Sequence, residues 1–384
     1  MIAVYERPSA WARLRPVFSG FDLPLLALVL ALAALGMVTM YSVGFDHGSR
    51  FVDHGRNMLL AALLMFVVAQ VPPQRLQAVA VPLYTLGLAL LVATALFGIT
   101  KKGATRWLQV GVVIQPSEIL KLAMPLMLAW WFQRREGQLR LLDFVIAGVL
   151  LLLPTALVAR QPDLGTAILV LSGGLYVMFF AGLSWRLIVP VMVVAGLGVA
   201  GIFISGDALC QPDVPWHGLR DYQKQRVCTL LDPSTDPLGK GFHIIQGMIA
   251  IGSGGLAGKG FMSGTQTHLE FIPERTTDFI FAALGEEFGL LGTGGLVLGF
   301  ACLILRGLWI AAQAPTVFSR LLAGALSLSF FTYAFVNMGM VSGILPVVGV
   351  PLPFISYGGT AMVTLGVALG MLMSIARSRG LMQR

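Results

Sequence analysis

The chain has 384 residues, of which 57% are hydrophobic and only 11% are charged. An ordinary soluble domain carries roughly a quarter charged residues, so the composition excludes a soluble globular protein. The formal net charge of +8 is spread as short clusters between apolar stretches, which indicates topology signals and not a nucleic-acid-binding patch.

Apolar stretches of about 20 residues, long enough to cross a bilayer as a helix, recur along nearly the whole chain. The first, Phe21 to Val43, is too long for a secretory leader, so we expect a retained span. The predicted spans cover residues 22–44, 56–71, 78–98, 116–132, 143–160, 166–182, 184–205, 278–305, 321–342 and 357–376. The sequence therefore predicts an all-α integral membrane protein with about ten transmembrane helices, forming a single polytopic domain over residues 1–384.

The basic residues predict the orientation of these spans. With a cytoplasmic N-terminus, 13 arginines fall on the inside, against 6 basic residues in the short outside loops. This excess predicts that both termini are cytoplasmic. The one long hydrophilic segment, residues 206–277 between the seventh and eighth helices, is then extracytoplasmic. Together with the start of the next helix it holds 10 of the 18 acidic residues, and segments of such length are usually functional.

The three cysteines are too few for a disulfide scaffold or a cysteine-based metal cluster. Cys210 and Cys228 fall in the long segment, which would lie in oxidising space. A bridge between them is chemically allowed, and the sequence leaves it open.

A short loop predicted to lie outside carries three cations, Lys101, Lys102 and Arg106, followed by Trp107. This departs from the tendency of basic residues to stay inside. An anionic lipid-linked ligand would explain the departure. The alternative is a peripheral loop whose Trp107 lies at the membrane interface.

Two charged residues, Glu118 and Lys121, stand three apart inside an apolar span. Charges inside a membrane are costly, so we expect them to pair and to face the protein interior. They either lock helices together or present the lysine to a phosphate while the glutamate holds it. After the next span, residues 160–166 form a tight turn from which Asp163 points toward the long segment, although the turn itself needs only its Pro and Gly.

The glycine-rich stretch Gly252–Gly260 superficially matches a phosphate loop. Ser253 stands where the first glycine belongs and Gly260 replaces the final Ser or Thr, so the stretch is not a nucleotide site. Its glycines are better suited to close backbone packing or to anion binding at membrane depth. The five histidines show no metal-binding spacing.

Asp278 lies where the long segment enters an apolar helix. Partial desolvation there would make its carboxylate a better general base. An acidic residue at that position also has a purely structural explanation, because Asp favours the N-terminal end of a helix. Both interpretations stay open on position alone.

Four segments resemble one protein family, which is named for shape, elongation, division and sporulation: residues 115–121, 161–165, 273–281 and 353–360. They follow in the family's order over nearly the whole chain. The stretches from Gly264 to Asp278 and from Phe354 to Gly359 are highly specific. The sequences at 222–227 and 264–274 favour the elongation branch over the division branch. The family usually has His at 276, where this chain has Thr, so an imidazole there has no general role.

The resemblance implies a peptidoglycan glycosyltransferase that polymerises lipid II on the outer face of the bacterial cytoplasmic (inner) membrane. Asp278 matches the family's catalytic aspartate, and it would hold a Mg²⁺ or Mn²⁺ ion if one is required. The implied partner is a class B penicillin-binding protein, a transpeptidase, of the elongation complex.

The remaining predicted substrate-binding residues follow from the same interpretation. Lys121 and Arg106 would stabilise the departing pyrophosphate, and Glu118 would orient Lys121. The set is completed by Trp107, Asp163, Arg275 and Ser356. Three alternatives stay open: a lipid II flippase that uses the same charges to guide the headgroup, a non-catalytic scaffold, and the division-specific paralogue.

Overall fold

The computed structural model describes residues 21–45, 48–101, 104–211, 214, 216, 221–236, 239–272 and 274–382. Each of the ten predicted spans coincides with a helix. These helices are α2 (Leu23–Val43), α3 (Arg50–Ala69), α4 (Pro73–Phe97), α5 (Pro116–Gln133), α6 (Leu141–Arg160), α7 (Leu164–Phe180), α8 (Trp185–Ile204), α13 (Ile280–Ala312), α14 (Val317–Val341) and α15 (Gly359–Met382). The prediction of an all-helical multi-pass membrane protein is confirmed.

Eight helices in the described part of the chain are long and apolar enough to cross a bilayer. The other two of the ten are α5, which carries the Glu118–Lys121 pair, and α7, which has only 17 residues. Both pack against α14, the most enclosed part of the bundle together with α15. Polarity in α5 is therefore tolerated because protein surrounds it instead of lipid.

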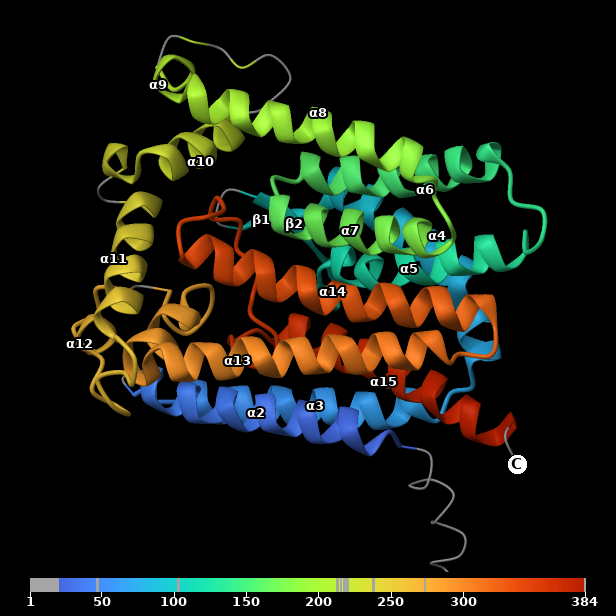
Figure 1. Cartoon of the computed structure of the whole chain (residues 1–384), viewed down its shortest axis with the longest axis horizontal. Helices are drawn as coiled ribbons and strands as arrows, with labels where there is room; N and C mark the ends of the chain where they lie inside the picture. Colours follow the sequence, from blue (N-terminus) through green and yellow to red (C-terminus); the bar gives the residue numbers. More distant parts are fainter. Residues whose placement is uncertain are drawn as a thin grey trace, which may run out of the picture.

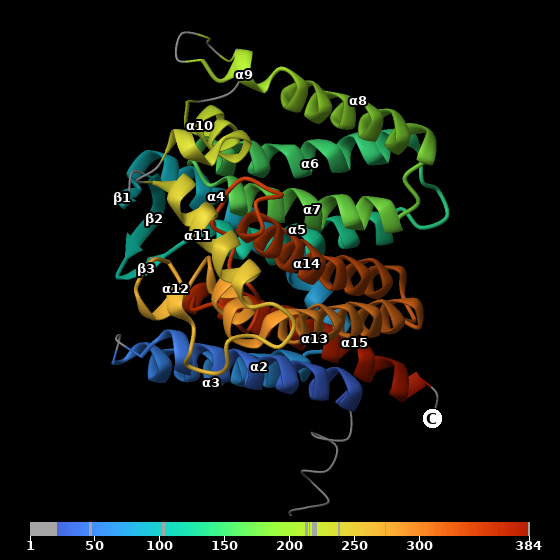
Figure 2. The same ribbon diagram turned by 60° about the vertical axis from the view of Figure 1, so that its left-hand side comes forward.

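The helices form a bundle in which α2 and α3 lie along one side and α6 along the other, with α13, α14, α15, α5 and α7 between them (Figures 1 and 2). In the most apolar 18-residue stretch of α14, 72% of the residues are buried, and the same share is buried in the corresponding stretch of α15. The hydrophobic core therefore centres on the C-terminal helices, onto which the N-terminal helices pack.

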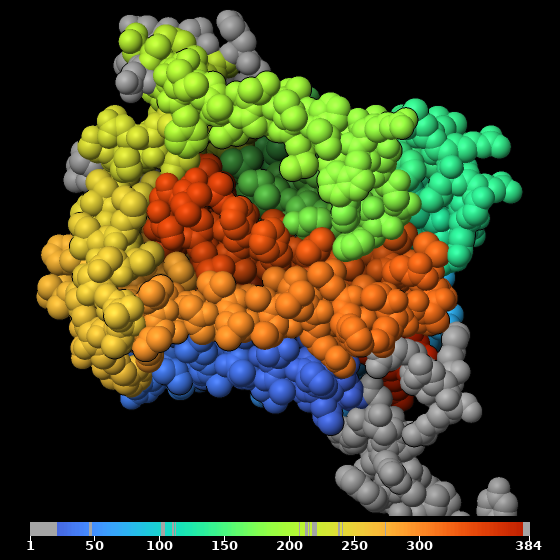
Figure 3. Space-filling view, in the orientation of Figure 1, coloured from blue at the N-terminus to red at the C-terminus, as the bar shows by residue number. Residues whose placement is uncertain are grey.

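Helix α8 is the exception to this packing. None of its 20 residues is buried, and it contacts the rest of the chain chiefly through α9. The space-filling view shows a hollow between α8 and the bundle, floored by α6 and α7 (Figure 3). An apolar helix without protein neighbours needs lipid around it, so this hollow opens to the membrane.

A small three-stranded antiparallel sheet was not predicted. It consists of β1 (Ile99–Lys101), β2 (Ala104–Val110) and β3 (Val112–Ile114), in the order β1-β2-β3. Runs of β-branched residues favour these strands, and Gly111, with φ of 71°, makes the turn between β2 and β3. The sheet positions Arg106 at the end of the bundle.

The segment 206–277 is largely helical. It contains α9 (Gly206–Leu209), α10 (Asp221–Leu231), the 3₁₀ turn η1 (Pro233–Thr235), α11 (Lys240–Ser253) and α12 (Thr265–His268). Its helices lie at the same end of the bundle as the sheet, opposite the C-terminus (Figures 1 and 2). The bridge that the sequence left open is formed: Cys210 and Cys228 are disulfide-bonded and join α9 to α10.

The glycine-rich stretch serves close backbone packing. Helix α13 is broken at Gly289, whose φ of 62° and ψ of −157° are not helical. Around the break, the amides of Lys259 and Gly260 donate to the carbonyls of Glu286 and Glu287, at 2.9 and 3.0 Å. In return, the amides of residues 290 and 291 donate to the carbonyls of residues 255 and 256. The stretch thus supplies the backbone partners that the broken helix lacks.

Candidate active site

The predicted intramembrane ion pair is present at the start of α5. The Lys121 Nζ lies 2.7 Å from the Glu118 carboxylate, and the Thr364 hydroxyl of α15 donates to the same carboxylate at 2.9 Å. Lys121 is only 8% exposed, and its Nζ lies 5.3 Å from the ring centroid of Tyr333. The pair therefore joins α5 to α14 and α15, and its charge is compensated locally.

Arg106 and Asp163 meet at the turn between α6 and α7. The Arg106 guanidinium donates to the carbonyls of Gln161 and Pro162 at 3.4 and 2.5 Å, and its Nη1 lies 3.9 Å from Asp163 Oδ2. The other carboxylate oxygen of Asp163 caps α7 by accepting from the Thr166 amide at 3.1 Å. Arg106 is thus held by the backbone carbonyls of the turn, and its contact with the Asp163 carboxylate is longer than a hydrogen bond.

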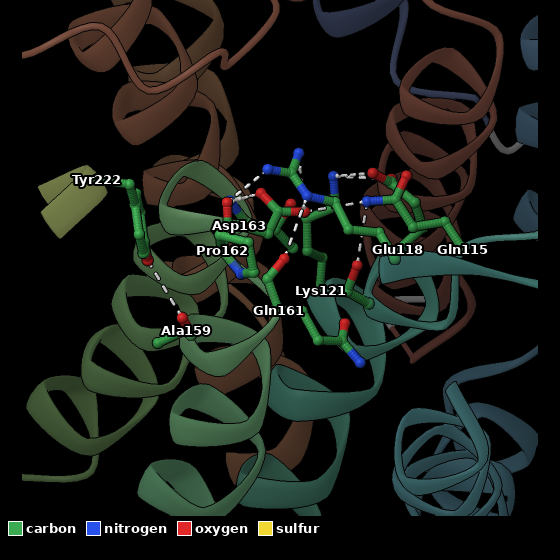
Figure 4. Close-up of polar contacts among 11 residues, drawn as sticks. Gln115, Glu118, Lys121, Ala159, Gln161, Pro162, Asp163 and Tyr222 are labelled. Carbon is green, nitrogen blue, oxygen red and sulfur yellow. Dashed lines mark hydrogen bonds and ion pairs between the residues drawn. The ribbon is translucent and has the colours of Figure 1, made fainter. Parts of the chain in front are cut away.

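Gln115 links these two groups, a role that the sequence did not reveal. Its amide donates to Asp163 Oδ2 at 3.1 Å and to the Ser117 hydroxyl at 3.2 Å. Gln115 precedes α5, so it connects the start of that helix to the start of α7. Figure 4 shows Gln115, Glu118 and Lys121 next to the 161–163 turn, with Tyr222 on the other side of the turn.

Asp278 is half-buried in the turn before α13. The amide of Asn337, a fully buried residue of α14, donates to the Asp278 carbonyl at 3.0 Å and to the Val350 carbonyl at 2.7 Å. Gly349, with φ of 76°, lies against the carboxylate, because a Cβ there would stand 3.3 Å from Asp278 Oδ2. The backbone of Asp278 is therefore fixed by α14 while its side chain stays partly accessible.

Arg226 of α10 lies close enough to Asp278, Arg106 and Asp163 to feel the charge of each. Burial, and next the positive charge of Arg106, lower the pKa of Arg226, whereas the charges of Asp163 and Asp278 act in the opposite direction. Arg226 therefore lies within electrostatic range of all three. Arg226 falls within the 222–227 sequence that favours the elongation branch of the family, and no feature of the sequence pointed to a role for it in the site.

The other predicted site residues have mainly structural contacts. Trp107 is half-buried in β2 opposite Ile99. The buried Ser356 hydroxyl donates to the Thr277 carbonyl at 2.6 Å and accepts from the Leu352 amide at 2.8 Å. It ties the 353–358 segment to the turn that carries Asp278.

Arg275 points away from Asp278, toward the end of α2. Its Nε donates to the Val43 carbonyl at 3.2 Å, and its guanidinium carbon lies 5.5 Å from the ring centroid of Phe45. Thr276, where the family usually has His, is buried, and its hydroxyl accepts a hydrogen bond from Arg50. These contacts join the residues that precede the aspartate to the end of α2 and the start of α3.

The described residues include no group of three or more His, Cys, Asp or Glu side chains that could hold a metal ion. A divalent cation at Asp278 would therefore find no set of three such ligands among the described residues. A cavity of about 340 Å³ lies elsewhere, between the α3–α4 and α13–α14 turns and the end of α15. None of the candidate site residues lines it.

Comparison with known proteins places these features in a family. The chain is 49% identical to the peptidoglycan glycosyltransferase MrdB of Escherichia coli, over 94% of this chain and 95% of that protein. It resembles a chain of a peptidoglycan synthase complex that coordinates polymerization and crosslinking, with a TM-score of 0.75, 33% identity, and coverage of 94% and 98%. The rod shape determining protein RodA of Thermus thermophilus gives a TM-score of 0.68 at 28% identity, with coverage of 94% and 97%. The model of the FtsW, RodA and SpoVE family, described as cell cycle proteins, matches residues 23–380, and the chain therefore belongs to this family, the shape, elongation, division and sporulation family that its motifs resemble.

Proposed function

We propose that this chain is a peptidoglycan glycosyltransferase that polymerises lipid II into β-1,4 glycan strands during cell elongation. The observation that carries the proposal is the half-buried Asp278, held at its backbone by a buried amide and within electrostatic range of the Arg226 guanidinium, which itself lies near Arg106. A base beside clustered cations is what glycosyl transfer from a lipid diphosphate requires. The 49% identity to a protein named for this activity supports the same conclusion.

The reaction is an inverting transfer. The 4-hydroxyl oxygen of the acceptor GlcNAc forms a bond to the anomeric carbon of a donor MurNAc, and the bond from that carbon to the undecaprenyl pyrophosphate oxygen breaks. The hydroxyl proton passes to the carboxylate of Asp278, and the bond electrons leave with the pyrophosphate. An α-linked donor thus becomes a β-linked product without a covalent enzyme intermediate.

Positive charge is needed where the pyrophosphate departs. Arg106 is suited to this role, because its side chain is 30% exposed and its ion contact is loose. Lys121 is paired with Glu118 and only 6% of its side chain is exposed. It would therefore stabilise the pyrophosphate by long-range electrostatic attraction and not by direct contact. Asp163 lies beside Arg106 and balances part of its positive charge.

The lipid tails of both substrates stay in the bilayer, so the substrates approach sideways. The hollow beside α8 supports this route, because that helix has no buried residue and leaves a membrane-facing opening next to α7 and α14 (Figure 3). A headgroup that enters there meets the end of the bundle where Asp163 lies.

We place this end of the molecule outside the bacterial inner membrane and both termini in the cytoplasm. The Cys210–Cys228 disulfide supports that orientation, because disulfides persist in oxidising compartments. The excess of arginines on the other side supports it as well. A class B penicillin-binding protein is the proposed partner, in line with the resemblance to a peptidoglycan synthase complex.

Lipid II polymerisation by the purified full chain, alone and co-purified with its cognate class B synthase, tests the proposal. Asp278→Ala and Asp278→Asn should yield no glycan polymer, whereas Asp53→Asn, a carboxylate that pairs only with the exposed Arg56 in the ion pairs described, should match the wild type. Polymer formed in detergent distinguishes polymerisation from flipping, which needs a bilayer. Equal polymer from wild type and a folded Asp278→Asn would remove Asp278 from catalysis, and no polymer from any form would favour the flippase.

A further inference from the structure

Helix α10 is held at two points, one of them beside the candidate site. The Tyr222 hydroxyl donates to the Ala159 carbonyl at 3.2 Å, at the end of α6 and directly before the 161–163 turn (Figure 4). The Cys210–Cys228 disulfide ties the same helix to α9. A helix of 11 residues is marginal alone in water. These anchors therefore hold α10 where it is and fix the direction of its side chains.

Arg226 lies one turn after Tyr222 on α10, on the same face of the helix. Its guanidinium carbon lies 5.6 Å from the ring centroid of Tyr222, so the ring positions it. Its Nη1 atom is buried and has no hydrogen-bond partner among the described residues. A buried guanidinium nitrogen without an acceptor is uncommon in folded proteins. It indicates that an acceptor from outside the chain completes the site.

The charges around Arg226 indicate the nature of that acceptor. Arg106 is close enough to lower the pKa of Arg226, after the larger effect of burial. The two guanidinium groups come from different elements, β2 and α10. The contact of Arg106 Nη1 with Asp163 at 3.9 Å is longer than a hydrogen bond. Two neighbouring guanidinium groups, each with an Nη1 atom that makes no hydrogen bond in the contacts described, are suited to bind a multiply charged oxyanion.

We propose that Arg226 and Arg106 together form an anion site that binds the diphosphate of the lipid-linked sugar donor, one guanidinium to each phosphate. This inference rests on the proposed function and adds to it a residue and an element, α10 of the 206–277 segment. The site holds the leaving group on the opposite side of the anomeric carbon from Asp278. The charges of Asp163 and Asp278 favour the protonated form of Arg226.

The test combines catalysis with binding for Arg226→Gln and Arg226→Lys. Arg56→Gln is the matched control, because it removes the same charge from a side chain that is 74% exposed. Binding is measured as inhibition of polymerisation, and as thermal stabilisation, by undecaprenyl diphosphate, undecaprenyl monophosphate and inorganic pyrophosphate. A charge-assisted hydrogen bond corresponds to about a 10- to 100-fold change in affinity.

We expect Arg226→Gln to weaken binding of undecaprenyl diphosphate by about 10- to 100-fold and to change monophosphate binding far less. Arg226→Lys should recover part of the loss, because it keeps the charge without the two-pronged geometry. If pyrophosphate binds like the diphosphate lipid, the headgroup alone is recognised. If it does not, the lipid tail contributes to binding as well. In both cases, weaker binding of undecaprenyl diphosphate by Arg226→Gln supports the arginine site.

Equal diphosphate affinity in wild type and Arg226→Gln would overturn the proposal. A loss of kcat with unchanged diphosphate binding would also overturn it and would make Arg226 a positioning residue for Asp278. A wild type that makes no polymer but binds undecaprenyl diphosphate in an Arg226-dependent way would refute the proposed function and leave the anion site intact. If Arg226→Gln does not fold, the comparison of Arg226→Lys with wild type decides the question in the same way.

Discussion

Replacement of Asn337 by Leu tests whether the position of Asp278 depends on the buried amide of α14. The variant keeps the side-chain size but removes hydrogen bonds to the Asp278 and Val350 carbonyls, at 3.0 and 2.7 Å. Hydrogen bonds between membrane helices contribute on average about 0.6 and at most about 1.7 kcal/mol each. Loss of both should therefore reduce the free energy of unfolding by about 1–3 kcal/mol.

The effect on activity should be larger than the effect on stability. A displacement of a catalytic group by about 1 Å costs roughly 100-fold in rate. We therefore expect Asn337→Leu to lower kcat for lipid II polymerisation by about 100-fold while the protein remains folded at the assay temperature. Ser329→Ala is the control on the same helix, because the Ser329 hydroxyl donates to the carbonyl of Ala325 within α14, at 2.8 Å.

Thermal unfolding in detergent and polymerisation at saturating lipid II measure the two effects separately. A folded Asn337→Leu variant with wild-type kcat would refute the reasoning, because the carboxylate would then need no support from the amide. A variant that loses stability and activity to the same degree as Ser329→Ala would refute it as well.

Three further predictions concern stability and are measured by thermal unfolding. Exchange of only one member of the Glu118–Lys121 pair should cost about 3–5 kcal/mol, because a charge stays buried without its partner, whereas the double exchange Glu118→Gln with Lys121→Met should recover most of that loss. Gly258→Ala should destabilise the protein strongly, because its Cβ would overlap the Glu287 carbonyl at a φ of 81°, whereas Gly252→Ala, with nothing within 4 Å, should have little effect. Reduction of the disulfide between α9 and α10, which closes a loop of 18 residues, should cost about 3 kcal/mol.

Each of these predictions has a result that would contradict it. A double exchange at 118 and 121 as unstable as either single exchange would show that the loss comes from packing and not from charge. Equal unfolding temperatures for the two glycine variants would mean that the 254–260 stretch adapts its backbone. An unfolding temperature that does not respond to reductant would show that α10 is held by its other contacts.

Hydropathy predicted the helices well because a bilayer imposes one length and one polarity on every span. The strands at 99–114 were not predicted because segments of three to seven residues are too short to show a clear alternation of polar and apolar residues. The Glu118–Lys121 pair was predictable because an intramembrane charge requires a partner, and the structure supplies that partner three residues away.

The partners of Asp278 could not be predicted, because they come from distant parts of the chain. Asn337 lies 59 residues further along, and only its position as an amide within an apolar span hinted at an interhelical role. Gln115 belonged to a recognised motif, but its contact with Asp163 depends on how α5 and α7 pack. The direction of Arg275, toward α2, likewise follows from tertiary packing.

The break in α13 makes two distant segments depend on each other for protection from solvent. The carbonyls of residues 286 and 287 and the amides of residues 290 and 291 are hydrogen-bonded to residues 255–260, and neither set has its helical partner. Opening of the glycine-rich stretch would expose both sets at once, so the two segments should exchange their amide hydrogens as one cooperative unit. The break thus extends the slow-exchanging part of the molecule beyond the spanning helices and into the segment that carries α11 and α12.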